Sequence, residues 1–205
     1  MPPRLGIASG AILFAITYTT MCFGAEKEIP EKVFGISLGQ PLTAARCPKG
    51  KVGIALPTTF LCLMPDPIAE PWGAKLNAVC FPDSMRPDFV GSCLVAHVVG
   101  NRVESVGFDI PSMRDQDRAL TELRKKYGEP VRLNQSTVQS KLGARFLVYE
   151  AEWIFPEFKV EFDGSLTAEN IVLGSDRTTV TVFTDRYEKL RETWLAHKKA
   201  AEPKF

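Results

Sequence analysis

The chain has 205 residues, of which 45% are hydrophobic and 24% charged, and its formal net charge is +1. The balance of 25 basic against 24 acidic side chains argues against a nucleic-acid-binding protein and against a polybasic membrane-surface protein. Thirteen Phe, three Trp and four Tyr supply enough apolar mass for a folded core, which argues against intrinsic disorder.

The first 25 residues have the pattern of a secretory signal peptide. Arg4 is their only charged residue, an apolar stretch follows from about Leu5 to Phe23, and small residues close the segment at Gly24 and Ala25. A membrane anchor is the alternative, but glycines and hydroxyl-bearing residues within the stretch weaken it as a membrane span. We therefore expect export, periplasmic or secreted, with cleavage after Gly24 or Ala25.

Cleavage would leave a neutral chain with an even number of cysteines. Removal of residues 1–25 takes away Arg4 and no acidic residue, so the net charge becomes zero. It also removes Cys22, the residue that a lipidation signal would use, although Met21 before it is a poor match for the small residue such signals prefer. No other segment is apolar enough to span a bilayer, so we expect no integral membrane span after cleavage.

The four remaining cysteines predict disulfide bonds, because exported proteins with an even cysteine count commonly form them. Zinc is the alternative, but the gaps of 15, 18 and 13 positions lack the Cys-x-x-Cys spacing typical of zinc sites. Four cysteines allow three connectivities, and the sequence does not choose between them. Pairs that close short loops are favoured: Cys47 with Cys62 and Cys80 with Cys93.

Short strands dominate the expected structure of the first half, after a solvated segment at 26–32. Five prolines between residues 48 and 74 disfavour helix there. The expected elements are strands at 33–38, 58–64 and 75–81 and a short helix at 42–46.

The clearest hairpin joins strands at 92–99 and 102–110. Its loop is Gly100-Asn101, a two-residue type whose positive φ angles suit the twist of paired strands.

The clearest helix runs from Ser112 to Tyr127. Ser112 can cap it, apolar residues recur inside it at helical spacing, and basic residues fill its last turn. Gly128 then offers a left-handed C-terminal cap, and Pro130 prevents continuation.

The rest of the chain predicts mainly strands, followed by a second long helix. Thr184 or Asp185 would cap this helix. In chain order we expect a polar connection at 131–143, a hairpin of strands 144–155 and 157–162, strands at 170–173 and 177–183, and a helix at 185–199.

This order predicts an α+β protein, because the strands cluster instead of alternating with helices. It would have an antiparallel sheet, two main helices at about 112–127 and 185–199, and an N-terminal half crosslinked by disulfides. We expect a single domain at 26–205, and the order of elements leaves open two similar halves, about 33–99 and 102–183.

No pattern predicts catalytic residues, a cofactor or a metal site. His97 lies mid-strand without a nucleophile or acid beside it, so a hydrogen-bonded sheet histidine is the simpler explanation. Glu150 and Glu152 point to the same face of their strand, with Glu161 expected opposite. Three carboxylates on one face can bind calcium or form an acid/base pair, but a solvated strand face is the simpler explanation.

Two short motifs carry a resemblance to known proteins. They are Phe34-Gly35-Ile36-Ser37-Leu38-Gly39-Gln40-Pro41-Leu42, followed by Cys47-Pro48, and Leu123-Arg124-Lys125-Lys126-Tyr127-Gly128-Glu129-Pro130. Together they resemble a group of exported proteobacterial proteins of unknown function. The first is also similar to the strand-to-helix entry of small outer-membrane assembly lipoproteins of the BamE type. The resemblance implies a bacterial envelope protein and no particular reaction.

The leading hypothesis is that the exported protein binds another envelope protein and is not an enzyme. Trp72 and Phe89 are the first candidates for the partner surface, since strand packing explains large aromatics less easily in proline-rich loops. The alternative is that the two rings close the ends of the sheet. Two rival functions are a metal-binding or hydrolytic enzyme using Glu150, Glu152 and Glu161, and a carrier of a small ligand or lipid, which would need a large apolar pocket.

Overall fold

The computed structural model describes residues 31–48, 60–82, 84, 86–139, 143, 145–164 and 178–201. The expected signal peptide and the expected strand at 170–173 lie outside these residues. Among the helices of the described ranges, none is both long and apolar enough to cross a membrane.

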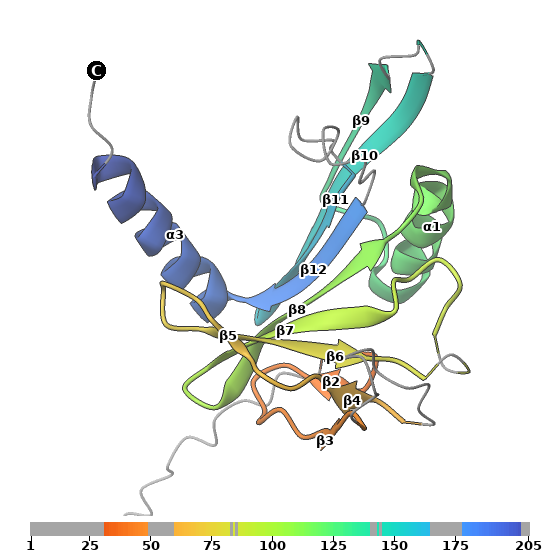
Figure 1. Ribbon diagram of the computed structural model, residues 1–205. Helices are drawn as coiled ribbons and strands as arrows, with labels where there is room; N and C mark the ends of the chain where they lie inside the picture. The colour runs from red at the N-terminus through yellow and green to blue at the C-terminus, as the bar shows by residue number, and fades with distance from the viewer. Residues whose placement is uncertain are drawn as a thin grey trace, which may run out of the picture.

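A ten-stranded sheet forms the body of the molecule (Figure 1), and all its pairings between described strands are antiparallel except that of β3 with β4. This confirms the expected α+β class. In spatial order the strands are β3 (Ala45–Arg46), β4 (Cys62–Leu63), β6 (Lys75–Cys80), β7 (Cys93–Val99), β8 (Arg102–Ile110), β12 (Thr178–Thr184), β11 (Phe158–Asp163), β10 (Arg145–Ile154) and β9 (Arg132–Gln139), with β5 (Ile68–Ala69) also pairing β6.

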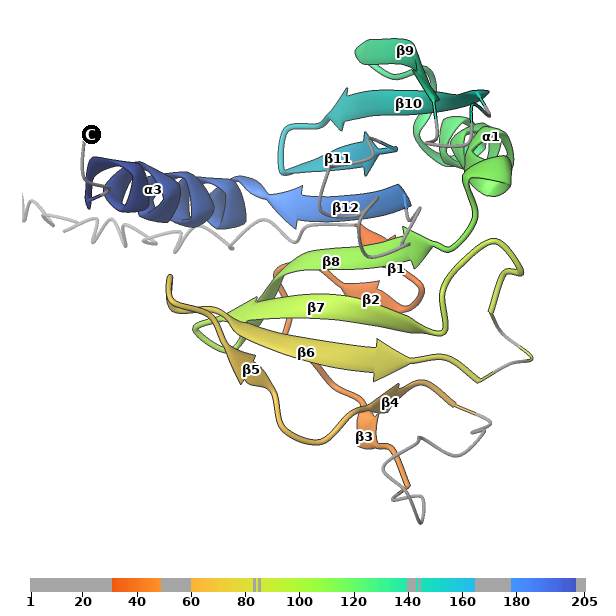
Figure 2. The ribbon, with the colours of Figure 1, turned by 45° about the horizontal axis from the view of Figure 1, so that its top comes forward.

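One face of the sheet, the core face, carries the hydrophobic core. The strand register puts Leu94, Val106, Val160, Phe162 and Trp153 on this face, and all five are essentially buried. Two elements cover them: α1 (Gln116–Tyr127), which follows the 3₁₀ turn η2 (Met113–Asp115), and the small hairpin of β1 (Lys32–Val33) and β2 (Ile36–Ser37) (Figure 2).

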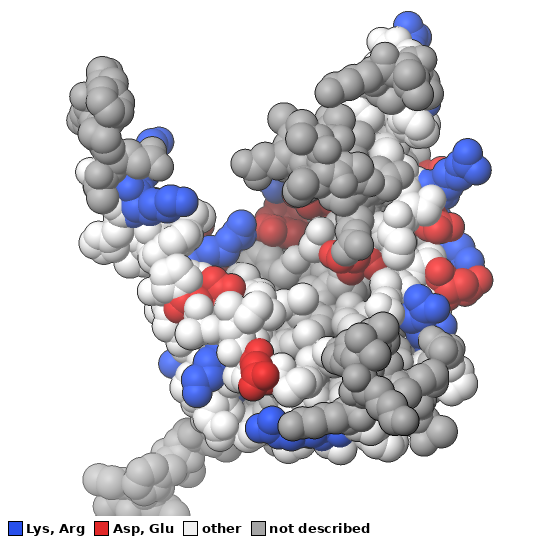
Figure 3. Space-filling view, in the orientation of Figure 1, with Lys and Arg blue, Asp and Glu red and all other residues white. Residues whose placement is uncertain are grey.

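The opposite face, the open face, carries His97, Ser105, Glu152 and Glu161. Helix α3 (Asp185–Ala201) begins at one end of this face, where the Thr184 hydroxyl accepts a hydrogen bond from the Tyr187 N–H at 3.3 Å. This confirms Thr184 as a cap of the helix. Beyond its first turns α3 projects away from the sheet (Figure 1), and Lys and Arg side chains lie along it in the space-filling view (Figure 3).

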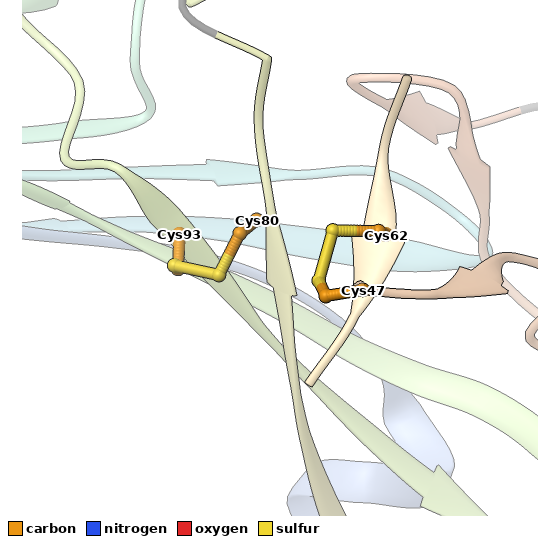
Figure 4. The surroundings of a disulfide bond; sticks show 4 residues. All are labelled: Cys47, Cys62, Cys80 and Cys93. Carbon is orange, nitrogen blue, oxygen red and sulfur yellow. A yellow bond between two sulfur atoms is a disulfide. The ribbon is translucent and has the colours of Figure 1, made fainter. Parts of the chain in front are cut away.

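The two expected disulfide bonds are present, Cys47–Cys62 and Cys80–Cys93 (Figure 4). The first joins the residue directly after β3 to β4, and the second joins β6 to β7, both in the N-terminal half of the described chain. Bonds of this kind indicate an oxidising, extracytoplasmic environment.

The short helix expected at 42–46 is wrong. Residues 41–44 have no regular structure, and Ala45–Arg46 form β3 beside β4. The Cys47 N–H donates to the Leu63 carbonyl at 2.8 Å, and Cys47 is bonded to Cys62, so tertiary contacts hold the segment extended. The prediction rested on Pro41, which starts a helix only where the following residues can continue it.

The single strand expected at 33–38 is instead the tight hairpin of β1 and β2. The chain reverses at Phe34 and Gly35, whose φ angles are +50° and +85°. Positive φ is uncommon for a phenylalanine, and the packing of its ring on Phe81 and Phe108 accompanies this conformation.

The polar connection expected at 131–143 is also wrong, because Arg132–Gln139 form β9. This strand pairs with β10 over eight consecutive residues. Its sequence shows no apolar alternation because it is the edge strand of the sheet, where nearly all its side chains are exposed. Neighbouring β10, rather than the local pattern, explains why it is a strand.

Candidate functional site

A cavity of about 570 Å³ opens between α1, the β1–β2 hairpin and the loop before β7, over the core face of the sheet. We call it the α1 cavity. It falls within the range of ~300–1,000 Å³ typical of ligand pockets. Its walls are mostly apolar, and the lining residues are Val33, Phe34, Pro87, Phe89, Phe108, Arg118, Ala119, Glu122, Leu123, Lys126 and Tyr127.

The floor of the cavity is built by Phe34. Its ring meets Phe81 and Phe108 edge to face, with centroids 5.0 and 5.3 Å apart. Aromatic pairs favour this arrangement because the positive edge of one ring meets the negative face of the other. The hairpin is thereby fastened to the sheet and leaves space beneath α1.

Two ion pairs fasten α1 on either side of the cavity. Arg118 donates two hydrogen bonds, of 3.0 and 3.2 Å, to the carboxylate of Asp88 in the loop before β7. Lys126 lies eight residues further along, about two helical turns. Its ammonium donates to Glu31 at 2.6 Å and to the Lys32 carbonyl at 2.9 Å, just before the β1–β2 hairpin. We call these two pairs the clasps.

The third charged residue of the lining, Glu122, is also paired, with Lys125 at 2.7 Å. Each charged side chain that lines the cavity therefore already has a partner of opposite sign within the protein. A charged ligand would have to displace these partners from the lining side chains. An uncharged apolar group could bind with the ion pairs intact. The site is suited to an uncharged apolar group.

Two titrating groups of this region, Asp88 and Tyr127, have shifted pKa values. Hydrogen bonding from Arg118 lowers the pKa of Asp88 below its usual value, so this carboxyl stays ionised. Burial, together with the neighbouring Glu31 carboxylate, raises the pKa of Tyr127 well above its usual value. The Tyr127 hydroxyl thus keeps its proton and donates it to Glu31 at 2.7 Å.

Of the two residues expected on the partner surface, Phe89 lies in the wall of this cavity. Its ring is half-buried, and the Arg118 guanidinium stands 5.2 Å from its centroid. Trp72 lies elsewhere, against His97 and Tyr187 on the open face, with ring centroids 5.7 and 5.1 Å away. The two aromatics therefore do not form one continuous surface.

His97 belongs to an aromatic cluster with Trp72 and Tyr187. Burial, with a smaller contribution from the charge of Arg191, lowers the pKa of His97 to about 4, so its ring is neutral at pH 7. Its Nδ1 atom is buried and has no hydrogen-bond partner among the described residues. The sequence predicted a hydrogen-bonded histidine at this position. In the structure, ring packing against Trp72 and Tyr187 holds His97 instead.

Glu150, Glu152 and Glu161 do share the open face, as expected. Glu152 lies directly opposite Glu161, while Glu150 lies two residues further along β10, opposite Asp163. Glu152 is bridged to Arg132 at 3.2 Å, and burial raises the pKa of Glu161 above its usual value. His97 does not join them, because three strand spacings, about 14 Å, separate β7 from β11 along the sheet. No three potential metal ligands of the described ranges cluster closely enough to hold an ion.

The sequence analysis missed the cavity, although it named Phe89 and the apolar stripe of α1. The missing information was the position of the β1–β2 hairpin, which packs against a helix some 90 residues further along the chain. Comparison of the chain with protein-family models, with curated proteins and with solved structures finds no match. The chemistry of the α1 cavity therefore has to suggest its role.

Proposed function

We propose that the protein is exported to the periplasm or secreted and binds another envelope protein there, without catalysing a reaction. In this proposal the partner inserts an uncharged apolar side chain into the α1 cavity. The observation that carries it is the cavity itself, about 570 Å³ in volume, with apolar walls contributed by three separate segments of the chain.

Burial in such a cavity would supply one apolar anchor of a larger interface. A fully buried leucine or phenylalanine side chain contributes about 1.5–3 kcal/mol. Interfaces concentrate their binding energy in apolar anchors that fill pockets, with polar groups around the rim that keep water out. Arg118, Glu122 and Lys126 form such a rim, with their charges already paired.

Export is supported by two independent features. Residues 1–25 have the composition of a signal peptide, and the two disulfides suit a compartment outside the cytoplasm. The periplasm is the expected location for a partner in the envelope.

Site-directed photocrosslinking in cells tests the proposal. A photoreactive residue at Glu122, on the cavity rim, should crosslink one discrete envelope protein, whereas the same residue at exposed Thr193 on α3 should not. Leu123→Trp should place a larger side chain in the cavity, obstruct the partner's side chain and remove the crosslink from position 122. Equal crosslinking from both positions, or a crosslink that survives Leu123→Trp, would exclude the cavity as the contact.

A small apolar ligand or lipid is the second candidate for the same site, favoured by the cavity volume. Mass spectrometry of an organic extract of the purified mature protein separates the two. A carrier should release one apolar compound in a near-stoichiometric amount, and Leu123→Trp should lower that amount. A partner-binding protein should release none and still give the crosslink.

A further inference from the structure

The last strand of the sheet has an unusually open edge. At one end the sheet stops at β3, which has two residues, but at the other it stops at β9, which has eight (Figure 2). One side of β9 pairs with β10, and no described strand pairs with its other side. Alternate backbone N–H and C=O groups of β9 therefore point outward, ready to pair with another strand.

Natural edge strands are normally protected by lysines, prolines, bulges or short length. Of these devices, and of the other charged side chains that protect edges, β9 carries only the charge of Arg132. Arg132 is its only charged residue, it contains no proline, and its register with β10 is unbroken over eight residues. Every side chain except that of Val138 is exposed.

Exposed apolar side chains gather around this edge. The described residues include seven large exposed apolar side chains, and four of them, Val131, Leu133, Leu147 and Ile154, lie on or beside β9 and β10. Leu133 and Leu147 share the core face, and their exposed fractions are 41% and 47%. Leu133 lies on the open edge strand, opposite Ala151, and Leu147 lies on β10, opposite Thr137.

We propose that β9 is a dimer interface, which pairs antiparallel with β9 of a second copy of this chain. A two-fold axis perpendicular to the sheet keeps the core face of one copy continuous with that of the other. When Gln135 of one copy lies opposite Gln135 of the other, Leu133 of one copy faces Thr137 of the other. Arg132 then faces Val138. No like charges meet, and each Leu147 lies in one row with Thr137 of its own copy and Leu133 of the other copy, on the core face of both.

A second copy fits this edge better than an unrelated strand because the edge is complementary to itself. Cross-strand pairs of uncharged and apolar residues stabilise antiparallel strands, while like charges directly opposite each other destabilise them. The same operation that pairs the backbones also forms two rows across the interface, each with Leu147 and Thr137 from one copy and Leu133 and Ala151 from the other. None of the residues lining the α1 cavity belongs to β9, so the dimer is independent of the proposed function.

Sedimentation of the mature, disulfide-bonded protein over a range of about 1–200 µM tests the dimer. We expect a concentration-dependent dimer, and a molecule that stays monomeric throughout would overturn the proposal. The double variant Leu133→Lys/Thr137→Lys places lysines opposite lysines in the paired edge, so it should weaken the dimer at least about tenfold.

Thr179→Lys is the matched control, because Thr179 is exposed but lies on β12 inside the sheet. It should dimerise like the unmodified protein. Equal dimerisation of the double variant and the control would overturn the proposal. Hydrogen exchange tests the edge without any substitution: β9 amides should become protected as concentration rises, and unchanged exchange in a dimeric sample would place the interface elsewhere.

Discussion

Cys62 and Cys80 lie directly opposite each other on β4 and β6, although each is bonded to a different cysteine (Figure 4). Cys80 in turn lies opposite Cys93 on β7, so three cysteines form one row across three adjacent strands. Neighbouring strands are about 5 Å apart, within the Cα separation that a disulfide spans. The strand register therefore permits an alternative bond, Cys62–Cys80, which could form only after one of the two existing bonds is lost.

Loss of Cys93 should expose this alternative pairing. In Cys93→Ser the Cys80 thiolate can attack the Cys62 sulfur, form a Cys62–Cys80 bond and release Cys47 as a thiolate, with no net oxidation or reduction. We expect peptide mapping of the alkylated variant to find Cys62–Cys80 in a substantial fraction of molecules.

Cys80→Ser provides the control for this exchange. It frees Cys93, which is two strands away from β4, at about 10 Å, and so out of reach of the Cys47–Cys62 bond. This variant should keep Cys47–Cys62 and one free thiol. The same degree of rearrangement in both variants would contradict the row of cysteines.

The environment of His97 predicts a loss of stability in acid. Its pKa is lowered from 6.5 to about 4, so between these values the unfolded chain binds the proton more readily than the folded protein. The stability that neutral His97 contributes to the free energy of unfolding is therefore fully present above pH 6.5, and it is lost as the pH falls towards 4. We expect a loss of about 2 kcal/mol, after allowance for the partial exposure of the ring.

Urea unfolding at about pH 7, 5.5 and 4 measures this effect. His97→Phe keeps a ring against Trp72 and Tyr187 but cannot take up a proton, so its stability should depend less steeply on pH in this range. Carboxylates that titrate in the same range affect both proteins equally. The same slope in the two proteins would show that His97 does not carry the effect.

The two clasps of the α1 cavity should differ in strength. Glu31 is nearly buried, with 11% of its side chain exposed, so Lys126→Ala would leave a largely desolvated carboxylate with fewer partners. We expect a cost of about 1–3 kcal/mol. Arg118 and Asp88 are both exposed to solvent, so Arg118→Ala should cost less than Lys126→Ala. Urea unfolding of both variants measures the difference, and a larger effect for Arg118→Ala would contradict it.

Gly164, directly after β11, should not tolerate a side chain. A Cβ atom there would lie 2.6 Å from the Tyr149 carbonyl oxygen and 2.6 Å from Gln116 Oε1. The Tyr149 carbonyl cannot retreat freely, because it accepts the Gly164 N–H at 2.8 Å. Gly164→Ala should therefore destabilise the protein by about 2–4 kcal/mol.

Gly107 on β8 is the matched control for that substitution. A Cβ atom at Gly107 would have its nearest neighbours at 3.7 Å, an ordinary van der Waals distance. Gly107→Ala should change the stability by less than about 1 kcal/mol. Thermal unfolding followed by circular dichroism compares the two, and similar melting temperatures would contradict the expected clash at Gly164.

The elements recognised from the sequence are those specified by residues close together in the chain. Helix α1 lies where Ser112, its apolar spacing and Gly128 predicted a helix, and the β7–β8 hairpin turns at Gly100-Asn101. The disulfide pairs join cysteines only 15 and 13 positions apart. In each case the residues that determine the structure lie close together in the chain, so a local pattern reveals it.

The elements that were wrong or missed depend on distant partners. β9 is a strand because β10 lies beside it, and β3 is extended because Cys47 is bonded to β4. Nothing in their own residues distinguishes these segments from a loop or a short helix. Strand pairing and crosslinks override weak local preferences of this kind.

The α+β class, both long helices and the crosslinked N-terminal half thus follow from periodicity, caps and cysteine spacing. The α1 cavity depends on the docking of Phe34, Phe89 and Leu123 around one space, with Lys126 joined to Glu31 across 95 positions of the chain. Contacts between such distant segments leave no periodic signal in the sequence. The shape of the space between packed elements arises only when the whole chain is folded.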